Sequence, residues 1–227
     1  MGKLYIVGTP IGNLEDITLR ALRVLKEVDW VLCEDTRQTR KLLDHYQIRT
    51  PTQSFHQHSN IQKVDWITRQ LAEGKNLALV TDAGTPGISD PGGVLVKEAL
   101  RQGYKVEAVP GASSLTAAIS VAGIPLDKFV FLGFLPHKKG RQTLLKQIEL
   151  SEYPVILYES VHRIGKLLEE LAGKNYYLIV ARELTKKFET VYRGTIEEIK
   201  AKMKQEEAKG EFVVIIKGNR IYTKNEI

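Results

Sequence analysis

Residues 78–93, ALVTDAGTPGISDPGG, join a short apolar run to a loop rich in glycine, proline and aspartate. The apolar run at residues 77–80 predicts a buried strand, and helical spacing resumes at Val94. Glycine lets a backbone approach a ligand closely and proline stiffens a loop, so exposed amides and carbonyls can bind there. The loop is therefore the first candidate for a binding site, although tight turns alone would use the same residues.

The rest of the N-terminal half repeats this strand–loop–helix order. Apolar runs at residues 4–7, 30–33, 77–80 and 105–109 alternate with helical spacing at residues 16–28, 36–44, 60–73 and 94–102. The alternation predicts an α/β domain with a mostly parallel sheet and helices on both of its faces.

The C-terminal half is also expected to be α/β. Strands are predicted at residues 129–134, 154–160, 176–184, 188–194 and 211–218. Only a short turn separates the strands at 176–184 and 188–194, so they should be antiparallel and the sheet mixed. The stretch AGIPLDKF at residues 122–129 is the hinge candidate, and it predicts two domains, residues 1–118 and 119–227, joined near residues 118–127.

Composition limits the partners and the compartment. Lysine and arginine outnumber aspartate and glutamate by 33 to 27, which favours a polyanionic partner without proving one. Cys33 is the single cysteine, which excludes an intrachain disulfide and a multi-cysteine zinc site. There is no signal-peptide pattern at the N-terminus and no apolar run near the roughly 20 residues of a membrane span. We therefore expect a soluble, cytoplasmic protein without a membrane partner.

Several familiar catalytic motifs are absent from the sequence. Gly8 and Gly12 do not fit G-x-G-x-x-G, and neither a P-loop nor a G-x-S-x-G nucleophile motif occurs. His56 and His58 lie two residues apart without a helically placed carboxylate, so surface histidines and no metal site are expected.

Seven segments together carry a family resemblance. They are VGTPIGNLEDIT from residue 7, EDTRQTRKLL from 34, TDAGTPGISDPG from 81, VPGASS from 109, FLGFLPHKKGR from 131, YESVHR from 158 and ARELTKKFE from 181. In order and spacing they resemble the small-subunit (16S) ribosomal RNA cytidine 2'-O-methyltransferases of the tetrapyrrole methylase superfamily, from Leu4 to about Gly218. The resemblance implies two α/β domains, S-adenosylmethionine in a cleft between them, a homodimer, and small-subunit ribosomal RNA or the assembled small subunit as partner.

The same resemblance implies which residues bind the cofactor. Thr85 is a departure, because the wider superfamily usually has aspartate there, so polar contacts known from tetrapyrrole enzymes do not transfer to this position. Structural roles stay open for some of the set: Ile88 and Ala181 as core, and the two serines as helix N-caps. The predicted cofactor residues are Pro10, Gly84, Thr85, Ile88, Ser113, Ser114, Tyr158, Glu159 and Ala181.

Substrate chemistry is predicted for Asp35, Arg37 and Glu183. Asp35 and Arg37 follow a predicted strand and would handle the nucleotide, although Asp35 could instead cap the next helix and Arg37 be a surface charge. Methyl transfer to a ribose hydroxyl needs mainly alignment and a proton acceptor, for which Asp35, Asp82 and Glu183 are candidates. The basic segments PHKKGRQ and ELTKK could hold phosphates or form an ordinary solvated face.

Two other functions stay open. A methyltransferase acting on a tetrapyrrole or other small molecule would use the same fold, although EDTR and HKKGR favour RNA. A basic RNA-binding or assembly protein without catalysis would not need several cofactor loops, and it would show no heat of binding with S-adenosylmethionine.

Overall fold

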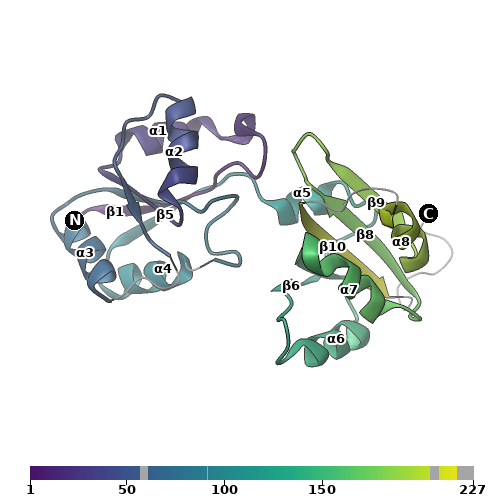
Figure 1. Ribbon diagram of the computed structural model, residues 1–227. Helices are drawn as coiled ribbons and strands as arrows, with labels where there is room; N and C mark the ends of the chain where they lie inside the picture. Colours follow the sequence, from purple (N-terminus) through teal and green to yellow (C-terminus); the bar gives the residue numbers. More distant parts are fainter. Residues whose placement is uncertain (57–60, 91, 205–209, 219–227) are drawn as a thin grey trace. The chain divides into compact units, whose positions relative to one another are not determined.

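The computed structural model describes residues 1–56, 61–90, 92–204 and 210–218. The chain forms two compact units, Met1–Ser113 (unit 1) and Ser114–Ile227 (unit 2), and each is built on its own five-stranded sheet (Figure 1). Helix α5 (Ser114–Ser120), which includes the predicted boundary at residue 118, belongs to unit 2 and contacts strand β10 (Glu211–Gly218). Two α/β units are thus present, as the sequence predicts.

Unit 1 contains a fully parallel sheet. Its order is β3-β2-β4-β1-β5, and every neighbouring pair runs in the same direction. The sequence did not predict β3, because its residues TQS include no apolar side chain. The strands are β1 (Lys3–Val7), β2 (Trp30–Cys33), β3 (Thr52–Ser54), β4 (Leu77–Leu79) and β5 (Lys105–Val109).

Helices cover both faces of this sheet, as predicted. Helices α1 (Leu19–Glu27) and α2 (Thr36–His45) pack on one face and α3 (Ile61–Ala72) and α4 (Gly92–Arg101) on the other, each pair with its own apolar core (Figure 1). The central strands are therefore buried on both sides, which explains why β2 and β4 are continuous apolar runs.

The helix predicted at residues 16–28 begins later than expected. Asn13 caps a short 3-10 turn, Leu14–Asp16, and the Thr18 hydroxyl accepts a hydrogen bond from Ala21 N at 3.1 Å to cap α1. Two successive N-caps, Asn13 and Thr18, thus divide the predicted helix into a 3-10 turn and α1. Asp16 is therefore not the N-cap of α1.

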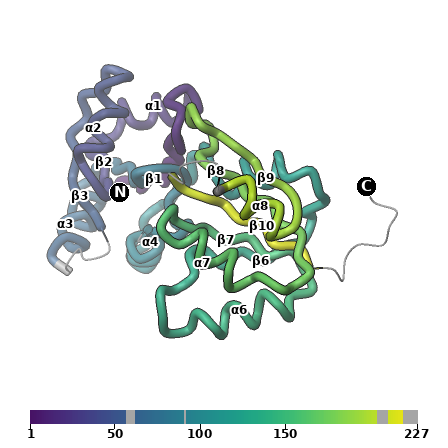
Figure 2. Tube along the Cα trace, turned by 45° about the vertical axis from the view of Figure 1, so that its right-hand side comes forward, coloured from purple at the N-terminus to yellow at the C-terminus, as the bar shows by residue number. Residues whose placement is uncertain are grey.

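Unit 2 contains the mixed sheet that the sequence predicts. Its order is β6-β7-β10-β8-β9; β6 and β7 are parallel, while the other neighbours are antiparallel. In Figure 2 the yellow β10 runs through the middle of this sheet. The remaining strands are β6 (Val130–Phe134), β7 (Val155–Ser160), β8 (Tyr176–Arg182) and β9 (Thr190–Gly194).

Three helices bury one face of the second sheet. Side chains of α6 (Arg141–Leu150), α7 (Val161–Leu171) and α8 (Ile196–Lys204) share an apolar core with the strands. Strand β8 ends at Arg182, before the predicted residue 184, because the backbone turns at Glu183 with φ of +50°. None of the helices in the described segments has both the length and the apolar character to span a bilayer.

Candidate cofactor and substrate site

Three loops of unit 1 are bound together at one edge of the sheet. Strands β4, β1 and β5 are parallel neighbours, so the loops that follow them emerge at the same carboxyl edge. Thr9 N donates to Gly84 O at 2.9 Å and Gly84 N donates to Thr9 O at 3.1 Å. Thr85 Oγ1 donates to Ala112 O at 3.1 Å, so the loop after β4 is tied to both of its neighbours.

Two glycines make this close approach possible. A Cβ atom on Gly111 would lie 2.7 Å from Gly8 O, and one on Gly8 would lie 2.8 Å from Gly111 N. Because both obstacles are backbone atoms, neither can move aside without displacing a loop. The loops after β1 and β5 therefore require glycine at both positions.

We expect Gly111→Ala to destabilise unit 1 by about 1 to 3 kcal/mol, the usual cost of overpacking. The matched control is Gly93→Ala, because a Cβ on Gly93 would meet no atom within 4 Å; since Gly93 lies in α4, alanine should leave stability unchanged or raise it by up to about 1 kcal/mol. Urea denaturation of both variants, followed through Trp30 and Trp66, measures the difference. Equal midpoints would show that the loops can separate at little cost.

The loop after β4 is held by its own aspartate. The Asp90 carboxylate accepts hydrogen bonds from Gly87 N at 2.7 Å, Ile88 N at 3.2 Å and Gly92 N at 2.7 Å. Gly84 and Gly87 have positive φ values of 85° and 92°, which glycine adopts without strain. Asp90 was not among the predicted residues, although an aspartate just before a helical run is the sequence signal of such a turn.

The predicted cofactor residues of unit 1 lie on these connected loops. Pro10 and Gly84 are buried, whereas Thr85, Ile88 and Ser113 are half-buried. Hydrogen bonds to Thr9, Ala112 and Asp90 hold the backbone and side chains of Gly84, Thr85 and Gly87 in place. Such a surface suits a ligand recognised through amides and carbonyls.

The loop after β2 joins the same edge. Asp35 N donates to Asp82 Oδ1 at 3.2 Å, which connects the end of β2 to the loop after β4. The Asp35 carboxylate also caps α2 by accepting from Arg37 N at 2.8 Å, as the structural alternative predicts. It binds the Arg37 guanidinium as well, through Nε at 3.1 Å and Nη2 at 2.7 Å.

This pairing sets the chemistry of Asp35. The hydrogen bonds from the side chain and then the backbone of Arg37 lower the pKa of Asp35 to about 2. A carboxylate with so low a pKa is a weak base, so it is better suited to holding Arg37 than to accepting a proton. The Arg37 side chain itself is 87% exposed.

Several carboxylates lie at this edge of unit 1. Burial, followed by the charges of Asp82 and Asp90, raises the pKa of Glu34. The charges of Asp82 and Asp90 thus add to the effect of burial on Glu34. In the described part of the chain, no three His, Cys, Asp or Glu side chains form a group that could hold a metal ion.

In unit 2, the predicted residues Ser114 and Tyr158 lie together. Ser114 Oγ donates to the Tyr158 hydroxyl at 3.1 Å, and the tyrosine ring lies 5.1 Å from that of Phe131 and 5.4 Å from that of Phe134. Burial is the main cause that raises the pKa of Tyr158. Ala181 is buried within β8.

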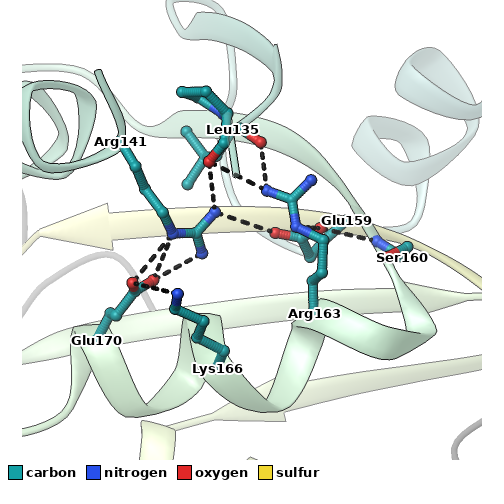
Figure 3. Close-up of polar contacts among 8 residues, drawn as sticks. Leu135, Arg141, Glu159, Ser160, Arg163, Lys166 and Glu170 are labelled. Atoms are coloured by element: carbon teal, nitrogen blue, oxygen red, sulfur yellow. Dashed lines mark hydrogen bonds and ion pairs between the residues drawn. The ribbon is translucent and has the colours of Figure 1, made fainter. Parts of the chain in front are cut away.

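Glu159 lies inside an ion-pair network of unit 2 (Figure 3). It is 0% exposed, and its carboxylate lies 3.3 Å from Arg163 Nε and 3.8 Å from Arg141 Nη1. Arg141 also binds Glu170, with Nη2 to Oε2 at 2.6 Å. Glu159 Oε2 has no hydrogen-bond partner, so one face of this buried carboxylate is held only by charge.

Glu183 lies at the turn after β8, where it binds neighbouring parts of unit 2. Its Oε1 accepts from Lys186 Nζ at 2.9 Å and from Glu211 N at 3.1 Å. Burial raises the pKa of Glu183, but these hydrogen bonds and the Lys186 charge outweigh burial, so the net pKa is lowered. The ionised carboxylate therefore stabilises the turn.

A pH dependence follows from this lowered pKa. The contribution of Glu183 to stability is complete above the ordinary glutamate pKa of about 4.3 and is lost as the pH falls through the folded-state value. The Tm difference between the wild type and Glu183→Gln should therefore be larger at about pH 6 than at about pH 3. A difference independent of pH would mean that the carboxylate charge does not stabilise the turn.

Comparisons with known proteins agree with this architecture. The family model of the tetrapyrrole (corrin/porphyrin) methylases matches residues 3–200. The chain is 45% identical to the ribosomal RNA small subunit methyltransferase I of Thermotoga maritima, over 96% of this chain and 99% of that protein. It is 46% identical to the protein of the same name from Escherichia coli O157:H7, over 96% of this chain and 79% of that protein.

Solved structures share the fold at lower identity. A diphthine synthase superposes with a TM-score of 0.77 at 18% identity, covering 97% of this chain and 92% of that one. Uroporphyrin-III C-methyltransferase from Thermus thermophilus, solved with S-adenosyl homocysteine, gives a TM-score of 0.65 at 23% identity, covering 97% of this chain and 100% of that one.

Proposed function

Since the chain belongs to the tetrapyrrole (corrin/porphyrin) methylase family, we propose that it methylates small-subunit ribosomal RNA with S-adenosylmethionine as the donor. The proposed acceptor is the 2'-hydroxyl of a cytidine ribose, as the seven resembling segments imply. The substrate is the small-subunit RNA, free or in the assembled subunit, which would place the reaction in the cytoplasm.

One observation carries the proposal more than any other. The identity to relatives named ribosomal RNA small subunit methyltransferase I is 45% and extends over 96% of this chain. It therefore includes both units, and not only the loops that a shared cofactor would require. The diphthine synthase and the uroporphyrin-III C-methyltransferase support no more than the architecture, because they are 18% and 23% identical to this chain.

The connected loops of unit 1 fit the proposed cofactor. S-adenosylmethionine supplies a methyl group already activated on a sulfonium cation, and the hydrogen bond from Asp35 N to Asp82 Oδ1 brings two carboxylates to this edge. The loop after β4 is open at Gly87, because a Cβ there would meet no atom within 4 Å. Pro10, Gly84, Thr85, Ile88 and Ser113 are the residues of unit 1 that we propose to hold it.

The cofactor residues predicted in unit 2 stay predictions with different possible roles. Ser114 and Tyr158 offer hydroxyl groups that are half-buried. Glu159 and Ala181 are buried, so their side chains would act by fixing β7 and β8 rather than by exposing polar atoms.

Asp35, Arg37 and Glu183 are the residues proposed to act on the substrate. Asp35 would hold Arg37 in place, and Arg37 would bind the nucleotide through guanidinium edges that Asp35 does not occupy. Methyl transfer also releases the proton of the attacking hydroxyl. Asp35 and Glu183 both have lowered pKa values and are weak bases, so Asp82 is the remaining candidate acceptor.

The proposal is tested with purified protein, S-adenosylmethionine labelled in the methyl group, and small ribosomal subunits or their isolated RNA. We expect label in the RNA and, by calorimetry, heat of binding for the cofactor alone. Cofactor binding together with methylation of a porphyrinoid but not of RNA would favour the small-molecule alternative. The absence of cofactor binding would favour a noncatalytic RNA-binding protein. Light scattering tests the predicted homodimer separately.

A further inference from the structure

Strand β6 ends in a bulge that changes the direction of one aromatic side chain. Phe131 pairs with Ile156 and Phe134 pairs with Tyr158, so β6 contains one more residue than β7 between these two pairs. Gly133 lies inside the bulge with φ of +61°, a conformation that favours glycine. Bulges in edge strands commonly redirect a side chain next to a functional site, and β6 is an edge strand of unit 2.

The redirected side chain is a phenylalanine that is half exposed. Phe134 is 50% exposed, and its ring lies 5.4 Å from that of Tyr158, which also contacts Phe131. The Tyr158 ring lies beside Phe134 and restricts its rotation, while half of the Phe134 side chain stays exposed. An exposed, laterally supported aromatic ring is a surface on which a flat ligand group can stack.

A basic loop follows this ring directly. His137, Lys138 and Lys139 are exposed, and throughout the described ranges neither lysine forms an ion pair. Cations at this position would attract phosphate groups.

Two arginines bind the backbone carbonyls at the start of the same loop. Arg163 Nη2 donates to Leu135 O, and Arg141 Nη1 donates to Pro136 O at 3.3 Å (Figure 3). Glu159 and Glu170 in turn hold the arginines. The loop is thus fixed by its backbone, which leaves its side chains available to a partner.

We propose that Phe134 and the loop at residues 136–140 form an RNA subsite, in which an unpaired base stacks on Phe134 and Lys138 and Lys139 bind the adjacent phosphates. The inference rests on the proposed function and identifies the part of unit 2 that holds the RNA. The exposed Lys138 and Lys139 beside Phe134 attract the negative phosphates of RNA. They would repel a second copy of this chain, whose net charge is +6. Unpaired RNA is the form whose bases are free to stack on aromatic side chains.

The test is fluorescence anisotropy with a labelled single-stranded RNA oligonucleotide and the same sequence as a duplex. Wild-type protein should prefer the single strand, and Phe134→Ala should weaken its binding roughly fivefold to hundredfold, whereas Phe134→Trp should retain it. Lys138→Ala combined with Lys139→Ala should reduce the slope of log affinity against log salt by about 1.4.

A matched control lies at the other end of the same two strands. Tyr153 is 38% exposed with Lys128 Nζ 5.7 Å from its ring centre, so it offers the same chemistry before β6 and β7 begin. Tyr153→Ala should leave RNA affinity unchanged. An equal loss in both aromatic variants would indicate nonspecific binding and contradict the subsite.

Three further outcomes separate the RNA subsite from the proposed function and from other roles of Phe134. Unchanged RNA affinity in Phe134→Ala, with intact methylation by the wild type, would overturn the subsite and leave the proposed function standing. Weakened S-adenosylmethionine binding in calorimetry would assign the ring to the cofactor instead. A change of oligomeric state would assign it to an interface between copies.

Discussion

Replacing Glu159 with glutamine is expected to cost unit 2 about 3 to 5 kcal/mol of stability. The carboxylate is 0% exposed and ion-pairs with Arg163 and Arg141. A neutral amide would leave Arg141 paired with Glu170, whereas Arg163 would lose its carboxylate partner. A desolvated charge whose partner is removed is costly. Local unfolding of β7, which carries Glu159, and of the loop at residues 135–136 should therefore become more frequent.

Amide hydrogen exchange measures this effect in each unit separately, which matters because two units need not unfold together. Exchange in β7 and α7 should accelerate in Glu159→Gln, while peptides of unit 1 keep their rates. The control is Glu98→Gln, since Glu98 makes a two-bond pair with Arg101 on the surface of unit 1, with Nε to Oε2 at 2.9 Å and Nη2 to Oε1 at 2.7 Å. It should change no exchange rate measurably. A Glu159→Gln variant as protected as the wild type would show that the network does not depend on its central charge.

Replacing Arg37 with alanine is expected to lower methyl transfer roughly tenfold or more, because a lost charge-assisted hydrogen bond is worth about 1.5 to 3 kcal/mol. Arg37 is 87% exposed, so its removal leaves the core intact. Its two hydrogen bonds to Asp35 use Nε and Nη2, and the Nη1 edge can meet an RNA phosphate or a base edge. Lysine should restore activity only partly, since it cannot reproduce the planar fork.

Single-turnover methylation of small-subunit RNA and titration with S-adenosylmethionine decide this prediction. Cofactor affinity should stay near the wild-type value in Arg37→Ala. Arg101→Ala is the matched control, because Arg101 is an exposed arginine of unit 1 in a similar two-bond pair. Methylation at the wild-type rate in Arg37→Ala would make Arg37 a surface charge, and a collapse of cofactor binding would assign it to the cofactor.

The sequence predicted those strands and helices whose apolar residues recur with a regular period. Strands β2 and β4 are apolar runs that are almost fully buried, and β1 contains a shorter apolar run, so their pattern is visible without any contact information. β3 was missed because it is an edge strand of three polar residues, formed by pairing with β2. The late start of α1 depends on the Thr18 cap, which competes with Asn13 and Asp16 in the same segment.

The candidate site could be predicted only as a set of segments. The loops after β1, β4 and β5 were predictable because parallel strands end at one edge. Spacing alone could not reveal that Asp90 shapes the loop after β4, or that Arg141 and Arg163 reach Glu159 from α6 and α7. These contacts depend on packing between distant segments. The roles of Asp35, Arg37 and Glu183 in methyl transfer stay predictions.

The most direct test of the proposed function is nucleoside mass spectrometry of small-subunit ribosomal RNA from cells with and without this protein. We predict that one 2'-O-methylcytidine is present in the first RNA, is missing from the second, and returns when purified protein and S-adenosylmethionine are added. Identical methylation in both RNAs, or a lost methyl group located on a base instead of a ribose, would contradict the account.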